Sequence, residues 1–449
     1  MKKIIIIAAA ALLSASATLS AQNASEAFFL NGYRLGYRYN PAVQNEGDFV
    51  SAGEFSSQSR ANVGAASFLY PRDGEVVTAL HESVSADEFL SGLSDLSYIS
   101  SGLNLNLVSY GFRKGEVYHT LEANVRALYG VTVPKEIFSL VKLGGESSYD
   151  LSNLCGYGNA YAEIAYGNSR RISDKVSIGA RAKLLIGIAS MRYNVSRFNL
   201  EMSESQYTAD ITTELDMTNH FHKFATDENG YISLLNSDLK GKWPLPSGAG
   251  LAVDLGAVVT PVEGLTISAS VLDLGGMLWH YGNKGRSNGR TVFTGVNDLT
   301  IDQIKNGEIK QQLQPVLDDL LSSVYLSSLE AANSIEMLPF SANAGVKYAL
   351  PFYDAVSLGL TGTYTHQTGM SHYDGRFGAS WEHPSGFGVT GNFGLDTFGT
   401  VYGLALKVRF HHFNFFAAYE DGTSAKVPYK NWHLNPNRRS CSFGITYDI

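Results

Sequence analysis

The carboxyl-terminal segment alternates between apolar and polar side chains up to the last residue. Residues at odd positions are apolar or aromatic and those between them are small or polar: Cys441, Phe443, Ile445, Tyr447 and Ile449 against Ser442, Gly444, Thr446 and Asp448. A period of two is typical of a β-strand with one apolar and one polar face. The same alternation recurs along most of the chain, so we expect an all-β fold.

The amino-terminal residues have the order of a cleavable signal peptide. Lys2 and Lys3 precede an apolar run over residues 4–13, and Leu19-Ser20-Ala21 precedes Gln22. This order predicts a signal peptide over residues 1–21. No later stretch of eighteen apolar residues occurs, so no transmembrane helix is expected. Any membrane span must then be built from strands, which predicts a transmembrane antiparallel β-barrel in the outer membrane.

Polar and charged residues fall on one face of several expected strands. Between Val117 and Tyr129, odd positions are mostly apolar and even positions are polar. In a membrane barrel the polar face lines the lumen. The predicted lumen-facing residues are Glu122, Asn124, Arg126, Arg181, Lys183, Asp254, Lys347, Lys407 and Arg409. They are interpreted either as partners of one another that fix an inner segment, or as a lining that selects solutes.

The connections between expected strands alternate in length, as in bacterial barrels with short periplasmic turns and longer outer loops. Short turns are expected at 113–116, 167–174, 260–264, 351–354, 382–386 and 411–412. Longer segments are expected at 130–156, 190–247, 275–339 and 421–439, with brief tips at 368–370 and 396–399. Counting from a strand near 61–70 gives about fourteen strands, within a range of 12 to 16 by the usual sizes of such barrels. An even number returns both termini to the periplasm.

One outer segment changes its period. Residues 299–332 have apolar side chains at helical spacing, and Pro315 is expected to divide them into two helices. The residues proposed for an outer-loop groove are Leu313, Leu317, Leu320, Leu321 and Val324. This apolar stripe is interpreted as a ligand groove over the barrel mouth or as ordinary packing of the loop.

Short motifs resemble those of the long-chain fatty acid transporter (FadL-like) superfamily of outer-membrane barrels. They are the stretch 27–32 (AFFLNG) and Asn40-Pro41-Ala42, which follow the signal peptide. The runs 169–175 (SRRISDK) and 252–257 (AVDLGA) resemble a Bacteroidota branch of such barrels, related to the PorV/FadL group. The resemblance implies a hatch over residues 22–60 with Asn40, Pro41 and Ala42 in its turn, and a barrel over 61–449 whose longest outer loops are 190–247 and 275–339.

The resemblance implies passive transport of small hydrophobic, fatty-acid-like compounds by a monomer in contact with outer-membrane lipid, without a cofactor. The alternative is a protein-handling platform with a partner in surface secretion or assembly, similar to barrels of type IX secretion. Both hypotheses require the same barrel, hatch and outer loops, so the sequence leaves both open.

Other chemistry has weaker support in the sequence. The pairs His220/His222 and His411/His412 lack a third clustered ligand, so no metal site is expected. Ser371-His372 is not set in a nucleophile motif, and neither Gly-x-Ser-x-Gly nor His-Glu-x-x-His occurs, so no enzyme is expected. A net charge of -8 argues against a nucleic-acid partner. Cys155 and Cys441 are expected to be small apolar fillers rather than a disulfide.

Overall fold

The computed structural model describes residues 26–144, 147–203, 206–219, 223–226, 232–238, 246–293, 326–423 and 436–449. Four predictions lie wholly or mostly outside these residues: the signal peptide over 1–21, the two helices divided at Pro315, the outer-loop groove from Leu313 to Val324, and the His220/His222 pair. Within the described residues, no helix is both long and apolar enough to cross a membrane.

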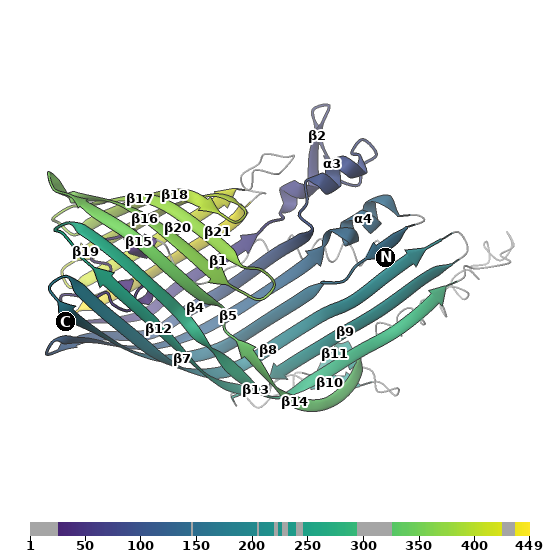
Figure 1. The fold of residues 1–449 in the computed structure, drawn as a ribbon, viewed down its shortest axis with the longest axis horizontal. Coiled ribbons are helices and arrows are strands. Elements are labelled where there is room, and N and C mark those ends of the chain that lie inside the picture. Colours follow the sequence, from purple (N-terminus) through teal and green to yellow (C-terminus); the bar gives the residue numbers. More distant parts are fainter. Residues whose placement is uncertain are drawn as a thin grey trace.

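In the described ranges, seventeen strands form one antiparallel sheet, which closes on itself where β1 pairs with β21 (Figure 1). The closed circuit of pairings runs through β1 (Phe49–Ala61), β4 (Leu96–Lys114), β5 (Val117–Pro134), β7 (Cys155–Ser173), β8 (Val176–Met202), β12 (Gly248–Val259), β13 (Leu265–Phe293), β15 (Phe340–Leu350), β16 (Tyr353–His366), β17 (His372–Glu382), β18 (Phe387–Asp396), β19 (Gly399–Phe410), β20 (Phe413–Thr423) and β21 (Pro436–Asp448). Pairing does not fix which strands cross a membrane, so the expected fourteen stays a prediction.

The two faces of the ring differ as the alternation predicted. Large apolar side chains point outward and are exposed, among them Leu251 (69%), Phe393 (58%) and Ile445 (45%). Their neighbours Asp254 and Asn392 point inward and are buried. An apolar exterior around a polar interior is the reverse of a water-soluble protein and is typical of a barrel surrounded by lipid.

The six short connections predicted from the sequence all join neighbouring strands at one end of the ring. One of them is tighter than expected, because β7 continues to Ser173 and pairs with β8 up to Val176. The run Ser169–Lys175 is polar, but its backbone completes the ladder, since polar residues are tolerated where strands leave the membrane. The turn is therefore Asp174-Lys175 rather than 167–174.

The first strand of the wall lies earlier than predicted. It is β1, over Phe49–Ala61, and not a strand near 61–70. The expected boundary between hatch and barrel at residue 60 therefore falls at the end of β1. The alternation was hard to recognise there because β1 is rich in serine and carries a bulge between Ser51 and Phe55, with Gly53 at a φ of 72°.

Residues 62–95 leave the wall and form a small cap at the end with long connections. The cap contains η2 (Ala65–Phe68), the hairpin of β2 (Leu69–Arg72) and β3 (Glu75–Thr78), and α3 (Ala86–Ser91). It packs against α4 (Lys135–Leu143), which follows β5, and stands above the ring in Figure 1. Phe68, Phe89 and Phe138 form its aromatic core. Burial in this core explains the apolar pattern that resembled a wall strand.

Two wall strands extend far beyond the others. β8 has 27 residues and β13 has 29, and β9 (Tyr207–Asn219) pairs with both of their outer halves. Within the segment 190–247, residues 190–202 are thus the continuation of β8, and residues 207–219 form β9. β6 (Ser148–Asp150) and β14 (Ser327–Met337) also pair with these extensions (Figure 1).

The helical period predicted for 299–332 is wrong at its carboxyl end. Residues 327–332 begin β14, and Leu329 is half exposed on that strand. The ladder with β13 determines the backbone there and overrides a local apolar spacing. The remaining described elements are α2 (Glu26–Phe29), η1 (Gly36–Arg38) and the separate hairpin of β10 (Lys223–Thr226) and β11 (Ile232–Asp238).

Candidate functional site

The segment 26–48 lies inside the ring, and we name it the inner segment. Its aromatic residues rest on glycines of the wall: a side chain at Gly345 would meet the ring of Phe28, and one at Gly378 would meet Phe29. Phe29 is 1% exposed. Glycines on the inward face thus give the inner segment room to lie directly against the backbone of the strands.

The predicted motif Asn40-Pro41-Ala42 touches β8, β12 and β13. The Asn40 side chain donates hydrogen bonds to the carbonyls of Ala257 (3.0 Å) and Ala269 (3.1 Å) and accepts one from the Ala42 amide (2.9 Å). A Cβ atom at Gly179 would lie 2.1 Å from the Pro41 carbonyl oxygen. The motif is a turn, as its composition predicts, and this turn is fixed to the wall.

Arg38 connects the inner segment to the charged face of the wall. Its guanidinium pairs with Glu54 on β1 and with Glu122 on β5, and donates to the Ser109 hydroxyl at 3.0 Å. The Tyr37 hydroxyl also donates to Glu122, at 2.9 Å. Burial raises the pKa of Tyr37 well above its usual value, so the hydroxyl stays protonated and remains a donor.

The charges continue from Glu122 across the wall in an alternating chain. Glu122 pairs with Arg181. Beyond it, acids and bases alternate over β5, β7, β8, β12 and β13. The pairs are Arg181 to Asp254 (3.3 Å), Asp254 to Lys183 (2.7 Å), Lys183 to Asp273 (2.5 Å), Asp273 to Arg126 (2.9 Å) and Arg126 to Glu163 (2.8 Å). We call the set from Glu54 to Glu163 the inner charge chain. Charged residues of β5, β8 and β12 that the sequence placed toward the lumen thus take part in this network; whether they also select solutes stays a prediction.

A bulge places Asp273 in this chain. Its φ is 63°, and the ladder between β12 and β13 shifts register at this point. Leu272 and Asp273 are consequently both buried, and the Asp273 amide donates to the Asp254 carboxylate at 2.7 Å. A non-glycine residue with positive φ is strained by about 1 kcal/mol or more. The ion pairs with Lys183 and Arg126 offset that strain.

The remaining predicted lumen residues lie nearer the short-turn end. Lys347 donates to the Phe28 carbonyl (3.1 Å) and the Asn31 side chain (2.7 Å), and Lys407 donates to the Asn31 carbonyl (2.5 Å) and pairs with Glu382. Both lysines therefore bind the inner segment. Arg409 differs, because its side chain is 53% exposed at the rim and lies 3.4 Å from Asp448.

The other end of the lumen is crossed by neutral side chains. Gln367 and His372 border the tip between β16 and β17, and they reach Tyr157 on β7 and Tyr98 on β4, which lie across the ring. Gln367 donates to the Tyr157 hydroxyl (3.1 Å), which lies 3.2 Å from the Tyr98 hydroxyl, and His372 Nε2 lies 3.3 Å from the latter. We call these four residues the outer bridge. All four are buried or nearly so.

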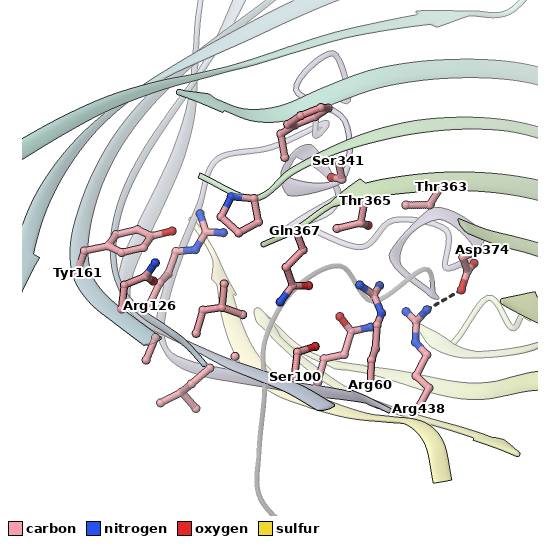
Figure 2. A pocket seen from close by; sticks show the side chains of 18 residues that line it. Arg60, Ser100, Arg126, Tyr161, Ser341, Thr363, Thr365, Gln367, Asp374 and Arg438 are labelled. Atoms are coloured by element: carbon pink, nitrogen blue, oxygen red, sulfur yellow. Dashed lines mark hydrogen bonds and ion pairs between the residues drawn. The ribbon is translucent and has the colours of Figure 1, made fainter. Parts of the chain in front are cut away.

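A cavity of about 70 Å³ lies in the lumen near the outer bridge. Figure 2 shows Tyr161 and Arg126 at one end and Arg60, Arg438 and Asp374 at the other. Leu128 and Pro339 add apolar surface to the lining. The volume is well below the roughly 300 Å³ and more of ligand pockets for drug-sized molecules. This cavity can hold a small group and not a long molecule.

One end of the cavity rests on a closed ion-pair ring. Arg376 pairs with Asp374 (2.9 Å) and Glu420 (2.7 Å), and Arg438 pairs with the same two acids at 2.5 and 2.9 Å. All four side chains are at most 5% exposed. Two bases and two acids neutralise each other here, which holds β17, β20 and β21 in register across the lumen.

Several of these residues were missed from the sequence. Asp374 and Arg376 alternate with Tyr373, Gly375 and Phe377, so the rule that found the lumen residues of β5 would also have found them. Arg38 gives no such signal, because it lies in a segment without strand periodicity.

The described histidine, serine and cysteine residues considered in the sequence for metal, nucleophilic or disulfide chemistry lie apart from one another or bind other groups. The described residues contain no cluster of three or more His, Cys, Asp or Glu placed to hold a metal. His411 and His412 form the turn after β19, and His412 Nδ1 lies 3.0 Å from the Asp448 carbonyl oxygen. The Ser371 hydroxyl meets His366 (3.2 Å), whereas His372 points to the outer bridge. Cys155 and Cys441 are both free thiols on β7 and β21.

Comparison with known families gives a match over most of the chain. The model of a family of unknown function, DUF5723, matches residues 41–420. The chain belongs to this family. No match was found among curated proteins.

Three solved barrels illustrate the structural likeness. The first is the Ralstonia pickettii toluene transporter TbuX, with 9% sequence identity, coverage of 91% of this chain and 92% of that chain, and a TM-score of 0.44. The second is a Pseudomonas aeruginosa FadL homologue, with 12% identity, coverage of 91% and 92%, and a TM-score of 0.43. The third is the translocator domain of the autotransporter NalP from Neisseria meningitidis, with 9% identity, coverage of 90% and 90%, and a TM-score of 0.34. At these identities and TM-scores the likeness decides neither substrate nor mechanism. The Bacteroidota branch expected from the sequence stays a prediction.

Proposed function

We propose that this DUF5723 protein is an outer-membrane barrel through which small hydrophobic, fatty-acid-like compounds pass passively, with the inner segment as its hatch. One observation carries the proposal: the inner segment crosses the lumen of a closed ring whose outer face is apolar. The exterior fits a bilayer. A barrel of this width needs something other than its own wall side chains to seal it. Solutes can therefore pass only when the inner segment moves.

The contacts of the inner segment determine what its movement would require. Arg38, Lys347 and Lys407 connect it to the wall through ion pairs and hydrogen bonds, and Phe28 and Phe29 pack against wall glycines. A passing compound would have to replace the polar contacts and cover the aromatic rings, so the hatch should open only while a compound is bound. The cavity combines the apolar surface of Leu128 and Pro339 with charged groups, which suits a compound with an apolar body and a polar end.

The hatch role is tested through the turn at Asn40. Replacing both Asn40 and Pro41 by Ala removes two hydrogen bonds to the wall and the fixed φ of proline. Uptake of a radiolabelled medium-chain fatty acid by cells producing the variant should differ at least threefold from that of the unchanged chain. The matched control is Arg170→Ala, at an exposed pair with Glu116 on the turn side. Equal uptake by the double variant, correctly inserted, would contradict the hatch mechanism.

The second candidate is a protein-handling platform. It is favoured by the cap over residues 62–95 and the long extensions of β8 and β13, which project beyond the ring (Figure 1). Such surfaces offer docking area that a simple channel does not need. Native mass spectrometry of the barrel in mild detergent separates the two proposals. A bound hydrophobic compound supports transport, whereas a stoichiometric second polypeptide supports the platform.

A further inference from the structure

Arg60 is a buried cation of the cavity that forms no direct ion pair with another described residue. It lies on β1, its side chain points into the cavity, and it is 9% exposed (Figure 2). Within the described part of the chain it forms no hydrogen bond, ion pair or ring contact. A guanidinium carries five N–H donors and stays charged, so a buried one normally has a carboxylate or phosphate as partner.

The other charges of the cavity are already paired. Arg438 holds Asp374 and Glu420, and Arg126 holds Glu163 and Asp273. Asp374 in turn is shared between Arg376 and Arg438. Removing Arg60 from water without a partner costs several kcal/mol by the general rule for buried ions. The fold therefore retains a buried positive charge that no direct ion pair among the described residues compensates, although the Asp374 and Asp396 carboxylates act on it from a greater distance.

The groups around Arg60 are suited to hold an anion. Gln58, Ser100 and Gln367 bring neutral hydrogen-bonding groups to the cavity. An oxyanion placed there would accept two N–H bonds from the fork of one guanidinium. Arg438 lies at the same end, but Asp374 and Glu420 already balance its charge, so Arg60 is the cation left to hold the anion.

We propose that this cavity is a binding site for a small oxyanion, a carboxylate or phosphate, with Arg60 as its main ligand. The volume of about 70 Å³ admits such a group but not a long chain. The anion is either a free ion or the head of an amphiphile whose tail lies outside the cavity. The site stands apart from the proposed transport, because binding to the closed barrel needs no passage through it.

Equilibrium dialysis of the full chain in detergent tests the site with three labelled probes: acetate, inorganic phosphate and octanoate. At least one probe should bind saturably at one per barrel, and Arg60→Met should weaken that binding at least tenfold. Arg60→Lys, which keeps the charge but loses the fork, should show an intermediate affinity. Arg170→Met, a change of an exposed arginine, should bind like the unchanged chain.

The probes also distinguish the source of the anion. Similar binding of acetate or phosphate and octanoate indicates a free ion, and binding of octanoate alone indicates the head of an amphiphile. Ser100→Leu fills the cavity without altering a charge and should also weaken binding, so the test survives if Arg60→Met fails to insert. No saturable binding of any probe, or undiminished binding in both Arg60→Met and Ser100→Leu, would overturn the proposal. Neither result depends on the uptake assay of the hatch.

Discussion

The two ends of the lumen are closed in different ways. The inner segment is held by the inner charge chain through Arg38, which contacts the buried carboxylates of Glu54 and Glu122. The outer bridge consists of neutral side chains joined by hydrogen bonds of 3.1 to 3.3 Å. A charge-assisted hydrogen bond is about twice as strong as a neutral one. We call the inner segment with the inner charge chain the inner closure, and the outer bridge the outer closure. The difference indicates that the inner closure is firm and that the outer closure, next to the cavity, opens more readily.

The largest effect is expected when the cation of the inner closure, Arg38, is removed. Arg38→Met leaves Glu54 and Glu122 buried near each other without their shared partner, which costs about 3 to 5 kcal/mol by the rule for broken buried pairs. Backbone amides of the inner segment should then exchange hydrogen at least a hundredfold faster. Arg72→Met, which removes an exposed pair with Glu88 in the cap, is the control and should leave that exchange unchanged.

The sequence predicted the strands of the wall better than the contacts inside the ring. Alternation over residues 117–129 identified Glu122, Asn124 and Arg126 because a strand places successive side chains on opposite faces. The same rule failed at β1, where serines and a bulge interrupt the period, and at Asp273, where a bulge shifts inward positions from even to odd. Arg38 and Arg60 were beyond reach for another reason. Their surroundings come from strands distant in the sequence, and only the closed ring brings them together.

A second change tests the inner closure without altering any charge. Gly179→Ala would place a Cβ atom 2.1 Å from the Pro41 carbonyl oxygen, so the turn at Asn40 must move away from β8. Overpacking of this kind costs about 1 to 3 kcal/mol. Proteolysis within the inner segment should become measurably faster. Gly391→Ala, with open space around its Cβ, is the matched control; equal proteolysis of both variants would show that the turn does not rest on the wall.

The smallest effect is expected at the outer bridge. Tyr157→Phe removes the hydroxyl that accepts from Gln367 and meets Tyr98, which costs about 1 kcal/mol for a neutral hydrogen bond. The backbone amides of the inner segment should exchange hydrogen at an unchanged rate. A cysteine introduced at Ser100 should react with a small thiol reagent several times faster in Tyr157→Phe than in the chain that keeps Tyr157. If Tyr157→Phe loosened the inner segment as much as Arg38→Met, the two closures would be one cooperative unit.

The central claim is that the inner segment closes the lumen, and single-channel conductance in a planar bilayer tests it most directly. The full chain should show no stable open current, and a chain lacking residues 26–48 should show a large, steady conductance. Equal currents from the two chains, both inserted as closed barrels, would contradict the account.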